Sequence, residues 1–262
     1  MEETFEAIGI DVPSEKDFNH LAERAGDQGE PTQLCRRGAT LHGRCWKLGE
    51  GLEVWTVLYE SGTGEIFYAD CRPGFRARYT QRVSPWALTE YDEDGEAIVH
   101  GYCDGYETEV LFELQNLTEV GPEGFRAQEL HVGLCGLAYR ARVTSEPPET
   151  RWQPLEEAAP SRAAHENDWS LSGRVISFKP LRNPVSGTDL YWVYLDLGRL
   201  RLEVLVNTKA LRGGGLAVGA GFSAEVWLQG HVLDRRALLS RYEGRDASAT
   251  KASLWAHLRR RN

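Results

Sequence analysis

Two short segments combine histidine and cysteine at the same spacing, His42-Gly-Arg-Cys45 and His100-Gly-Tyr-Cys103. Two imidazoles and two thiolates are the donors of a tetrahedral zinc site. Both segments lie in stretches that read as β-strand, where residues three positions apart point to opposite faces. Each pair would therefore need a β-bulge at its glycine before both side chains could reach one metal ion. Structural, half-buried histidines and cysteines are the alternative interpretation, and we expect no bound cofactor.

The sequence lacks the common motifs of nucleophilic, phosphate-binding and metal-dependent catalysis. It has no Walker loop, no G-x-S-x-G, no H-E-x-x-H and no G-x-G-x-x-G after a strand. The acidic run 92–94 stands in a glycine-bounded turn, as is typical of a solvated loop. Asp70 and Cys71, followed by Arg72 and Pro73, could line a cleft, but no partner base for a cysteine nucleophile is identifiable. The pattern favours a binding protein over an enzyme.

Aromatic and basic residues gather late in the chain. Trp192 and Tyr194 are two residues apart in a predicted strand, so both side chains project from one face. Arg201 follows on the next predicted strand, and Lys179 and Arg182 stand in the loop before the Trp192 strand. Rings flanked by cations can stack on the bases of single-stranded nucleic acid, at roughly 1–3 kcal/mol per base. The competing interpretation is that this face packs against the rest of the protein, because tryptophan is rarely left exposed.

These residues belong to a predicted all-β module at 169–233. Four runs rich in β-branched and aromatic residues are separated by glycine, proline and asparagine, the pattern of a small barrel or sandwich. The runs cover residues 171–179, 190–197, 201–207 and 222–233. The turn 198–200 is short enough to join the second and third runs in a tight hairpin.

The order of these runs resembles the OB-fold. A long first strand contains an interior glycine, Gly173, and a hairpin of strands two and three follows. Leu216-Ala-Val-Gly219 then precedes a last strand that begins Gly221-Phe-Ser-Ala-Glu-Val. The resemblance implies a barrel that binds single-stranded nucleic acid or oligosaccharide on the face of strands two and three and the adjoining loops.

The N-terminal part predicts an α+β module. Residues 4–10 read as a strand, and a helix is expected to begin after the N-cap Ser14, with Asp17 at the capping-box position, and to stop at Gly26. Strands follow at 40–47, 52–60 and 65–71. The buried stripe of the helix would consist of Phe18, Leu21, Ala22 and Ala25.

This βαβββ order is similar to one half of a vicinal oxygen chelate (glyoxalase-like) protein. The resemblance implies metal ligands on the strands, typically a histidine on the first strand of a module. Residues 4–10 contain no histidine, so the resemblance does not extend to the metal site.

Further strands are predicted at 78–83, 96–102, 108–117 and 125–143, the last interrupted at 133–136. Glu109-Val-Leu-Phe-Glu-Leu and Gly124-Phe-Arg-Ala-Gln-Glu are similar to Glu203-Val-Leu-Val-Asn-Thr and Gly221-Phe-Ser-Ala-Glu-Val. Internal duplication and convergent strand patterning explain this equally well.

The expected fold is therefore β-rich and of the α+β class. Residues 144–168 contain four prolines and few large apolar side chains, which is the composition of a linker. We expect an acidic α+β domain at 1–143, this linker, and a basic OB-like barrel at 169–262 that ends in helices at 234–242 and 251–261.

The charge is unevenly distributed along the chain. Residues 1–168 hold 15 Lys+Arg and 32 Asp+Glu, a net charge of −17, whereas residues 169–262 hold 15 and 7, a net charge of +8. A basic half can bind a polyanion. It can also attract the acidic half, within a monomer or across a homo-oligomer.

Five cysteines within the first 135 residues, without a C-x-x-C, favour reduced thiols. No apolar run approaches the roughly 20 residues of a membrane span, and the acidic start of the chain lacks the features of a signal peptide. We expect a cytoplasmic, non-enzymatic binding module that recognises single-stranded nucleic acid or another anionic ligand. The alternatives are a structural protein whose oppositely charged parts dock, and an enzyme with a cleft in the N-terminal part.

Overall fold

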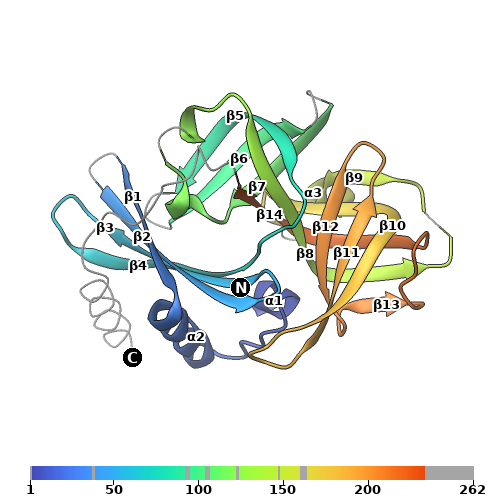
Figure 1. The fold of residues 1–262 in the computed structure, drawn as a ribbon, viewed down its shortest axis with the longest axis horizontal. Helices are drawn as coiled ribbons and strands as arrows, with labels where there is room; N and C mark the ends of the chain where they lie inside the picture. The colour runs from blue at the N-terminus through green and yellow to red at the C-terminus, as the bar shows by residue number, and fades with distance from the viewer. Residues whose placement is uncertain are drawn as a thin grey trace.

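The computed structural model describes residues 2–36, 39–91, 95–103, 107–121, 124–146, 148–159 and 164–233 (Figure 1). Strands dominate these residues and helices are few, so the fold is β-rich and of the α+β class, as predicted. The helices predicted at 234–242 and 251–261 lie outside the described residues.

The chain begins with two helices. Residues 4–10 do not form the predicted strand, because α1 is a helix over Glu2–Ala7. Phe5 and Ile8, three positions apart, are both buried. Periodicity alone separates strand from helix poorly in an apolar run this short.

The second helix, α2, spans Glu15–Gln28 and begins where it was predicted. The side chain of Ser14 accepts a hydrogen bond from the backbone N–H of Asp17, as an N-cap does. Ala22 and Ala25 are buried, and Phe18 and Leu21 pack beside them. The predicted stop at Gly26 is wrong, because the helix continues to Gln28 and Gly26 is buried within it. A glycine inside a helix costs about 1 kcal/mol, which tertiary packing can offset.

An antiparallel sheet of four strands, in the order β1-β2-β3-β4, follows the helices. The three predicted strands are confirmed as β2, β3 and β4. Strand β1 was missed, because Pro31 and its polar neighbours do not show the apolar alternation typical of a strand. Proline is tolerated there because β1 is an edge strand. The element order on which the glyoxalase-like resemblance was based is therefore not the one observed. The bounds are β1 Glu30–Arg36, β2 Ala39–Gly49, β3 Leu52–Glu60 and β4 Ile66–Phe75.

Five strands then close on themselves in what we call the first ring. The pairing runs from β5 to β6, β7, β14 and β8, and returns from β8 to β5. The contact of β7 with β14 is parallel and the others are antiparallel. The strands are β5 Gln81–Tyr91, β6 Glu96–Cys103, β7 Thr108–Leu114, β8 Leu130–Thr144 and β14 Gly221–Val232.

A second ring uses the same two strands, β8 and β14, together with β10 Asp168–Arg182, β11 Asp189–Asp196 and β12 Arg201–Asn207. The pairing runs from β10 to β11, β12, β8 and β14, and returns to β10. The four predicted runs thus correspond to β10, β11, β12 and β14. Gly173 fits the close approach of β10 to β11, since a Cβ there would lie 2.3 Å from the carbonyl oxygen of Asp196.

Strand β8 runs through both rings without the interruption predicted at 133–136. Gly133 and Gly136 stay in register with His231 and Leu228 of β14. A Cβ on Gly136 would lie 2.9 Å from Val226, so this glycine relieves crowding and does not mark a turn.

The sheet crosses the predicted domain boundary, because β8 pairs with β12 and β14 from the later part of the chain. The predicted linker contains a short strand, β9 (Arg151–Pro154), and one helical turn, α3 (Leu155–Ala158). The two pairs of similar segments that suggested an internal repeat occupy corresponding structures only in part. The first segments fall on β7 and β12, each of which pairs in parallel with a shared strand. The second segments fall on different structures, the 3₁₀ turn η2 (Gly124–Arg126) with the following loop and the start of β14.

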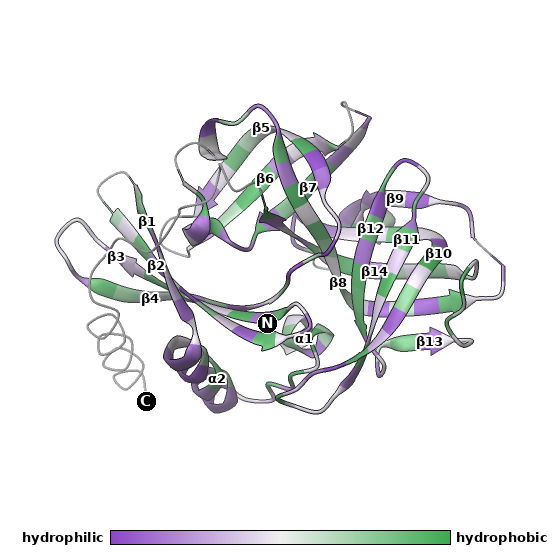
Figure 2. Cartoon of the chain, in the orientation of Figure 1, coloured by the Kyte–Doolittle hydropathy of each residue, from purple (hydrophilic) through white to green (hydrophobic). Residues whose placement is uncertain are grey.

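Two large apolar cores hold together the residues that the structure describes. One extends through both rings and includes Phe112, Leu134, Leu195 and Phe222. The other packs α1, α2 and the four-stranded sheet on the outer face of the second ring. Apolar and polar residues alternate along strands such as β5 and β10 (Figure 2), as expected for strands with one face on a core. Among the described residues, no helix has the length and apolar character to cross a membrane.

Candidate functional site

The structure places the five predicted ligand-binding residues on the second ring. Trp192 and Tyr194 lie on β11, and Arg201 lies on β12. Lys179 and Arg182 belong to β10 and not to a loop, and Lys179 stands opposite Trp192 in the register. The Arg182 side chain turns back to its own loop, where Nε donates to the carbonyl oxygen of Gly187 at 3.0 Å.

Trp192 is sealed inside the protein. Only 4% of it is exposed, it belongs to the core beneath α1 and α2, and its indole N–H donates to Glu203. The interpretation that this aromatic face packs on the rest of the chain is therefore the one observed for Trp192. The indole offers no open face to a ligand.

An aromatic side chain that the sequence analysis missed covers the same surface. Tyr79 is 47% exposed and stacks on Tyr194, with ring centroids 4.4 Å apart and planes inclined by 21°. The Arg78 guanidinium lies over the Trp192 ring, 5.1 Å from its centroid. The signal in the sequence was the basic and aromatic run Arg76-Ala-Arg78-Tyr79, which stands 115 residues before Tyr194.

One buried carboxylate fixes this arrangement. Glu203 accepts hydrogen bonds from the backbone N–H groups of Arg78 and Tyr79, at 2.6 and 2.7 Å. Burial raises the pKa of Glu203, and these bonds together with the Trp192 N–H oppose that rise. The side chain thereby ties the segment before β5 to the second ring.

We call the surface formed by Arg78, Tyr79, Lys179, Tyr194 and Arg201 the Tyr79 face. Lys179 and Arg78 share one exposed carboxylate, that of Glu50, at 2.8 and 3.3 Å. Arg201 is exposed. Three cations and two stacked tyrosines thus share this surface, and exposed pairs such as Lys179 with Glu50 are weak enough to exchange for another anion.

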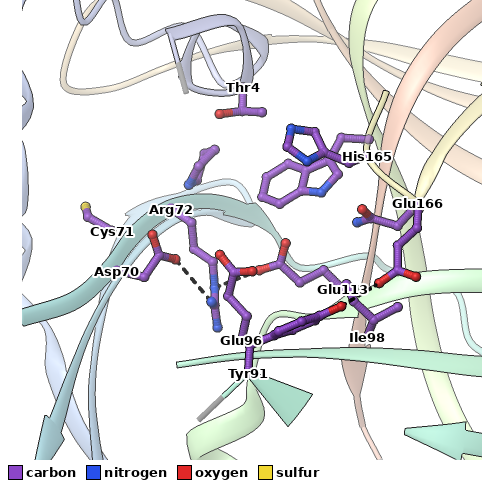
Figure 3. Close-up of a pocket in the computed structure, with 13 residues that line it drawn as sticks. Thr4, Asp70, Cys71, Arg72, Tyr91, Glu96, Ile98, Glu113, His165 and Glu166 are labelled. Atoms are coloured by element: carbon purple, nitrogen blue, oxygen red, sulfur yellow. Dashed lines mark hydrogen bonds and ion pairs between the residues drawn. The ribbon is translucent and has the colours of Figure 1, made fainter. Parts of the chain in front are cut away.

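A second candidate is a pocket of about 380 Å³ between the four-stranded sheet and the first ring (Figure 3). Asp70, Cys71, Arg72 and Pro73 line it, so the prediction that these residues line a cleft is confirmed. The rest of the lining comes from α1, β5, β6, β7, β14 and the segment before β10. These residues are Thr4, Tyr91, Glu96, Ile98, Glu113, His165, Glu166, Asn167 and Trp227.

Arg72 organises the carboxyl groups of this pocket. Its guanidinium is buried and lies 3.1 Å from Asp70 and 3.0 Å from Glu113. Burial raises the pKa of Glu113 to about 8, because the attraction of Arg72 is offset by repulsion from Glu96 and Asp70. Glu113 therefore holds its proton at neutral pH.

Cys71 is not an activated nucleophile. Burial raises the pKa of its thiol, and the nearby charge of Asp70 raises it further. The pocket also contains the protonated carboxyl group of Glu113. In the same lining the Tyr91 hydroxyl donates a hydrogen bond to Glu166 at 3.4 Å.

The four residues of the hypothetical zinc site have separate environments. His42 Nε2 is engaged by Glu60 Oε2 at 2.8 Å, and His100 packs against Trp86. Cys45 and Cys103 are buried. No group of three or more potential metal ligands occurs among the described residues. The acidic run 92–94 lies outside that part of the chain.

Comparison with known proteins found no matching family model, no similar curated protein and no similar solved structure.

Proposed function

We propose that the protein is a binding protein whose Tyr79 face recognises single-stranded nucleic acid. The observation that carries the proposal is the exposed Tyr79 ring stacked in parallel on Tyr194, with Arg201 on the neighbouring strand. A tyrosine held in this way can stack on a base, and the cations beside it can contact phosphates.

The position of the face on the ring supports the same proposal. The second ring is a closed barrel of five strands, and the Tyr79 face covers the outer side of β11 and β12. These are the second and third of the four strands that residues 168–232 contribute to the ring. In OB-like barrels this is the side that binds oligonucleotides. We therefore describe the second ring as OB-like, with β8 supplied from earlier in the chain.

The test is fluorescence anisotropy with a labelled oligothymidylate of about 20 nucleotides, long enough to cover an OB-type site. We expect binding that weakens as salt rises. Tyr79→Ala should weaken it about tenfold through loss of one stacked base, and Arg201→Ala should lower the salt dependence through loss of one phosphate contact.

Matched control variants are available on other surfaces. Phe67→Ala removes another exposed aromatic side chain, on β4, and Arg142→Ala removes another exposed cation, on β8. Both should leave the affinity unchanged. The proposal fails if the protein does not bind the oligonucleotide, or if Tyr79→Ala binds as well as the unmodified chain. Unchanged binding by Tyr79→Ala would instead suggest that the oligonucleotide binds residues 234–262, which hold eight of the 15 Lys+Arg of residues 169–262.

The proposal that oppositely charged parts dock has its own supporting contacts. Glu50 lies 2.8 Å from Lys179, and Asp11 lies 3.4 Å from Lys209. Both pairs join the acidic and basic parts within one chain, and both are exposed, so solvent screening makes each of them weak. Salt-dependent self-association without oligonucleotide binding, measured by sedimentation, would favour this function over the first.

A further inference from the structure

A pocket of about 630 Å³ lies between the start of β7, strand β9 and the turn that joins β11 to β12. We call it the Trp152 pocket. It is distinct from the Tyr79 face and from the pocket around Arg72. Its lining includes Glu107, Thr108, Glu109, Trp152, Glu157, Trp169 and Arg199.

Two stacked indoles form one wall of this pocket. The ring centroids of Trp152 and Trp169 are 4.2 Å apart, and their planes are inclined by 11°. Both N–H groups donate to backbone carbonyls of β7, Trp152 to Glu109 at 2.9 Å and Trp169 to Leu111 at 3.0 Å. Trp169 is only 3% exposed, so the half-buried Trp152 is the indole that can offer a ligand a ring face. Its N–H group is already used and is not available for a hydrogen bond to a ligand.

The polar groups of the pocket favour a cation. Glu107, Glu109 and Glu157 are exposed carboxylates that take part in no ion pair among the described residues, and Arg199 is the one cation in the lining. The lining therefore carries surplus negative charge beside aromatic rings, the combination that attracts organic cations.

Thr108, which also lines the pocket, provides a second observation that points to a binding site. The residue is buried, and its hydroxyl oxygen has no hydrogen-bond partner within the described part of the chain. A buried hydroxyl without a partner is costly. A ligand or its hydration water in the pocket would satisfy it.

We propose that the Trp152 pocket binds a small organic cation of the quaternary ammonium type, with its charged head against the Trp152 ring and the carboxylates around it. Tryptophan is the side chain that attracts such a cation most strongly through its ring face. This inference does not depend on nucleic-acid binding at the Tyr79 face.

The probe is choline, compared with dimethylbutanol, its uncharged carbon analogue, by saturation-transfer NMR on the full chain at constant ionic strength. We expect saturable binding of choline and none of the analogue. Glu157→Gln and Trp152→Leu should each weaken choline binding about tenfold. Glu146→Gln and Trp86→Leu are matched exposed controls on other surfaces and should bind choline normally.

Glu157→Gln still tests the proposal if Trp152→Leu fails to fold, because Glu157 is an exposed residue on α3 and glutamine has nearly the same size. Equal binding of choline and the analogue would overturn the proposal and indicate an apolar site. No choline binding, or unchanged binding by Glu157→Gln, would also overturn it.

Discussion

At the scale of single residues, two buried carboxyl groups are held in opposite protonation states by their neighbours. Burial acts to raise the pKa of Glu53, but its hydrogen bond to His231 and the charges of His231 and Arg76 outweigh this and hold it at about 2. Burial prevails at Glu113 and raises its pKa to about 8, because Arg72 must also balance Asp70. Glu53 thus has His231 as a second partner beside Arg76, whereas Glu113 has Arg72 alone and is repelled by Glu96 and Asp70.

The raised pKa of Glu113 predicts how stability depends on pH. Between pH 4.5 and about 8 the unfolded chain has released this proton while the folded chain still holds it. The contribution of Glu113 to the free energy of unfolding therefore falls as pH rises through this range. Glu113→Gln cannot ionise and should lose this part of the pH dependence, by at most about 1.4 kcal/mol per pH unit.

Urea unfolding of Glu113→Gln and the unmodified chain at pH 5, 6.5 and 8 measures this difference. The control is Glu146→Gln, which removes an exposed carboxylate and should follow the unmodified chain. If the difference between Glu113→Gln and the unmodified chain does not change with pH, Glu113 is ionised throughout and our description of the pocket is wrong.

At the scale of elements, capping and patterning specify where a segment begins more firmly than where it ends. Helix α2 begins after Ser14 as predicted, since the cap is a local hydrogen bond. Its end was misplaced, because packing carries the helix past Gly26. The same reasoning applies to β8, whose glycines resembled a break in the sequence and are paired in the structure.

Replacement of the N-cap residue Ser14 should destabilise α2 by an amount typical of a lost N-cap. Ser14→Ala removes the acceptor for the Asp17 N–H and should lower the free energy of unfolding by about 1 kcal/mol. Ser14→Asp should restore most of it, because aspartate is also a good N-cap. Urea unfolding measures both variants, with Ser145→Ala as an exposed control. Equal stability of Ser14→Ala and the control would show that the cap is unimportant.

At the scale of the whole molecule, the two rings cannot come apart as separate domains without breaking strands that both use. Strand β8 pairs with β5 at its start and with β12 further along, while β14 pairs with β7 and with β10. One apolar core continues through both rings. Residues 81–233 should therefore unfold as one unit, despite the proline-rich segment between β8 and β10.

Calorimetry tests this expectation through one variant in each ring. Val99→Ala lies on β6 of the first ring and Leu195→Ala lies on β11 of the second, and both positions are buried. Each variant should lower the midpoint of the same single transition, with equal calorimetric and van't Hoff enthalpies. Two transitions, each lowered by one variant alone, would show that the rings are independent domains.

Some features of the candidate sites follow from residues close together in the chain, and others depend on contacts between residues far apart. The sequence placed Tyr194 and Arg201 on neighbouring strands, since alternation fixes which side chains share a face. It put Lys179 in a loop, although this residue lies on β10. It did not reveal that Trp192 is covered or that Tyr79 covers the neighbouring surface. Nor did it bring Glu113 beside Arg72, because such contacts join residues tens of positions apart.

By itself, the sequence determined the local features of this protein: the β-rich class, the positions of most strands, the N-cap of α2 and the uneven charge. Each follows from interactions between residues close together in the chain. Only the tertiary structure decided that β8 and β14 serve both rings, and which aromatic side chain is sealed and which is exposed. The physical reason is that alternation gives a strand two distinct faces, whereas long-range packing decides what covers each of them.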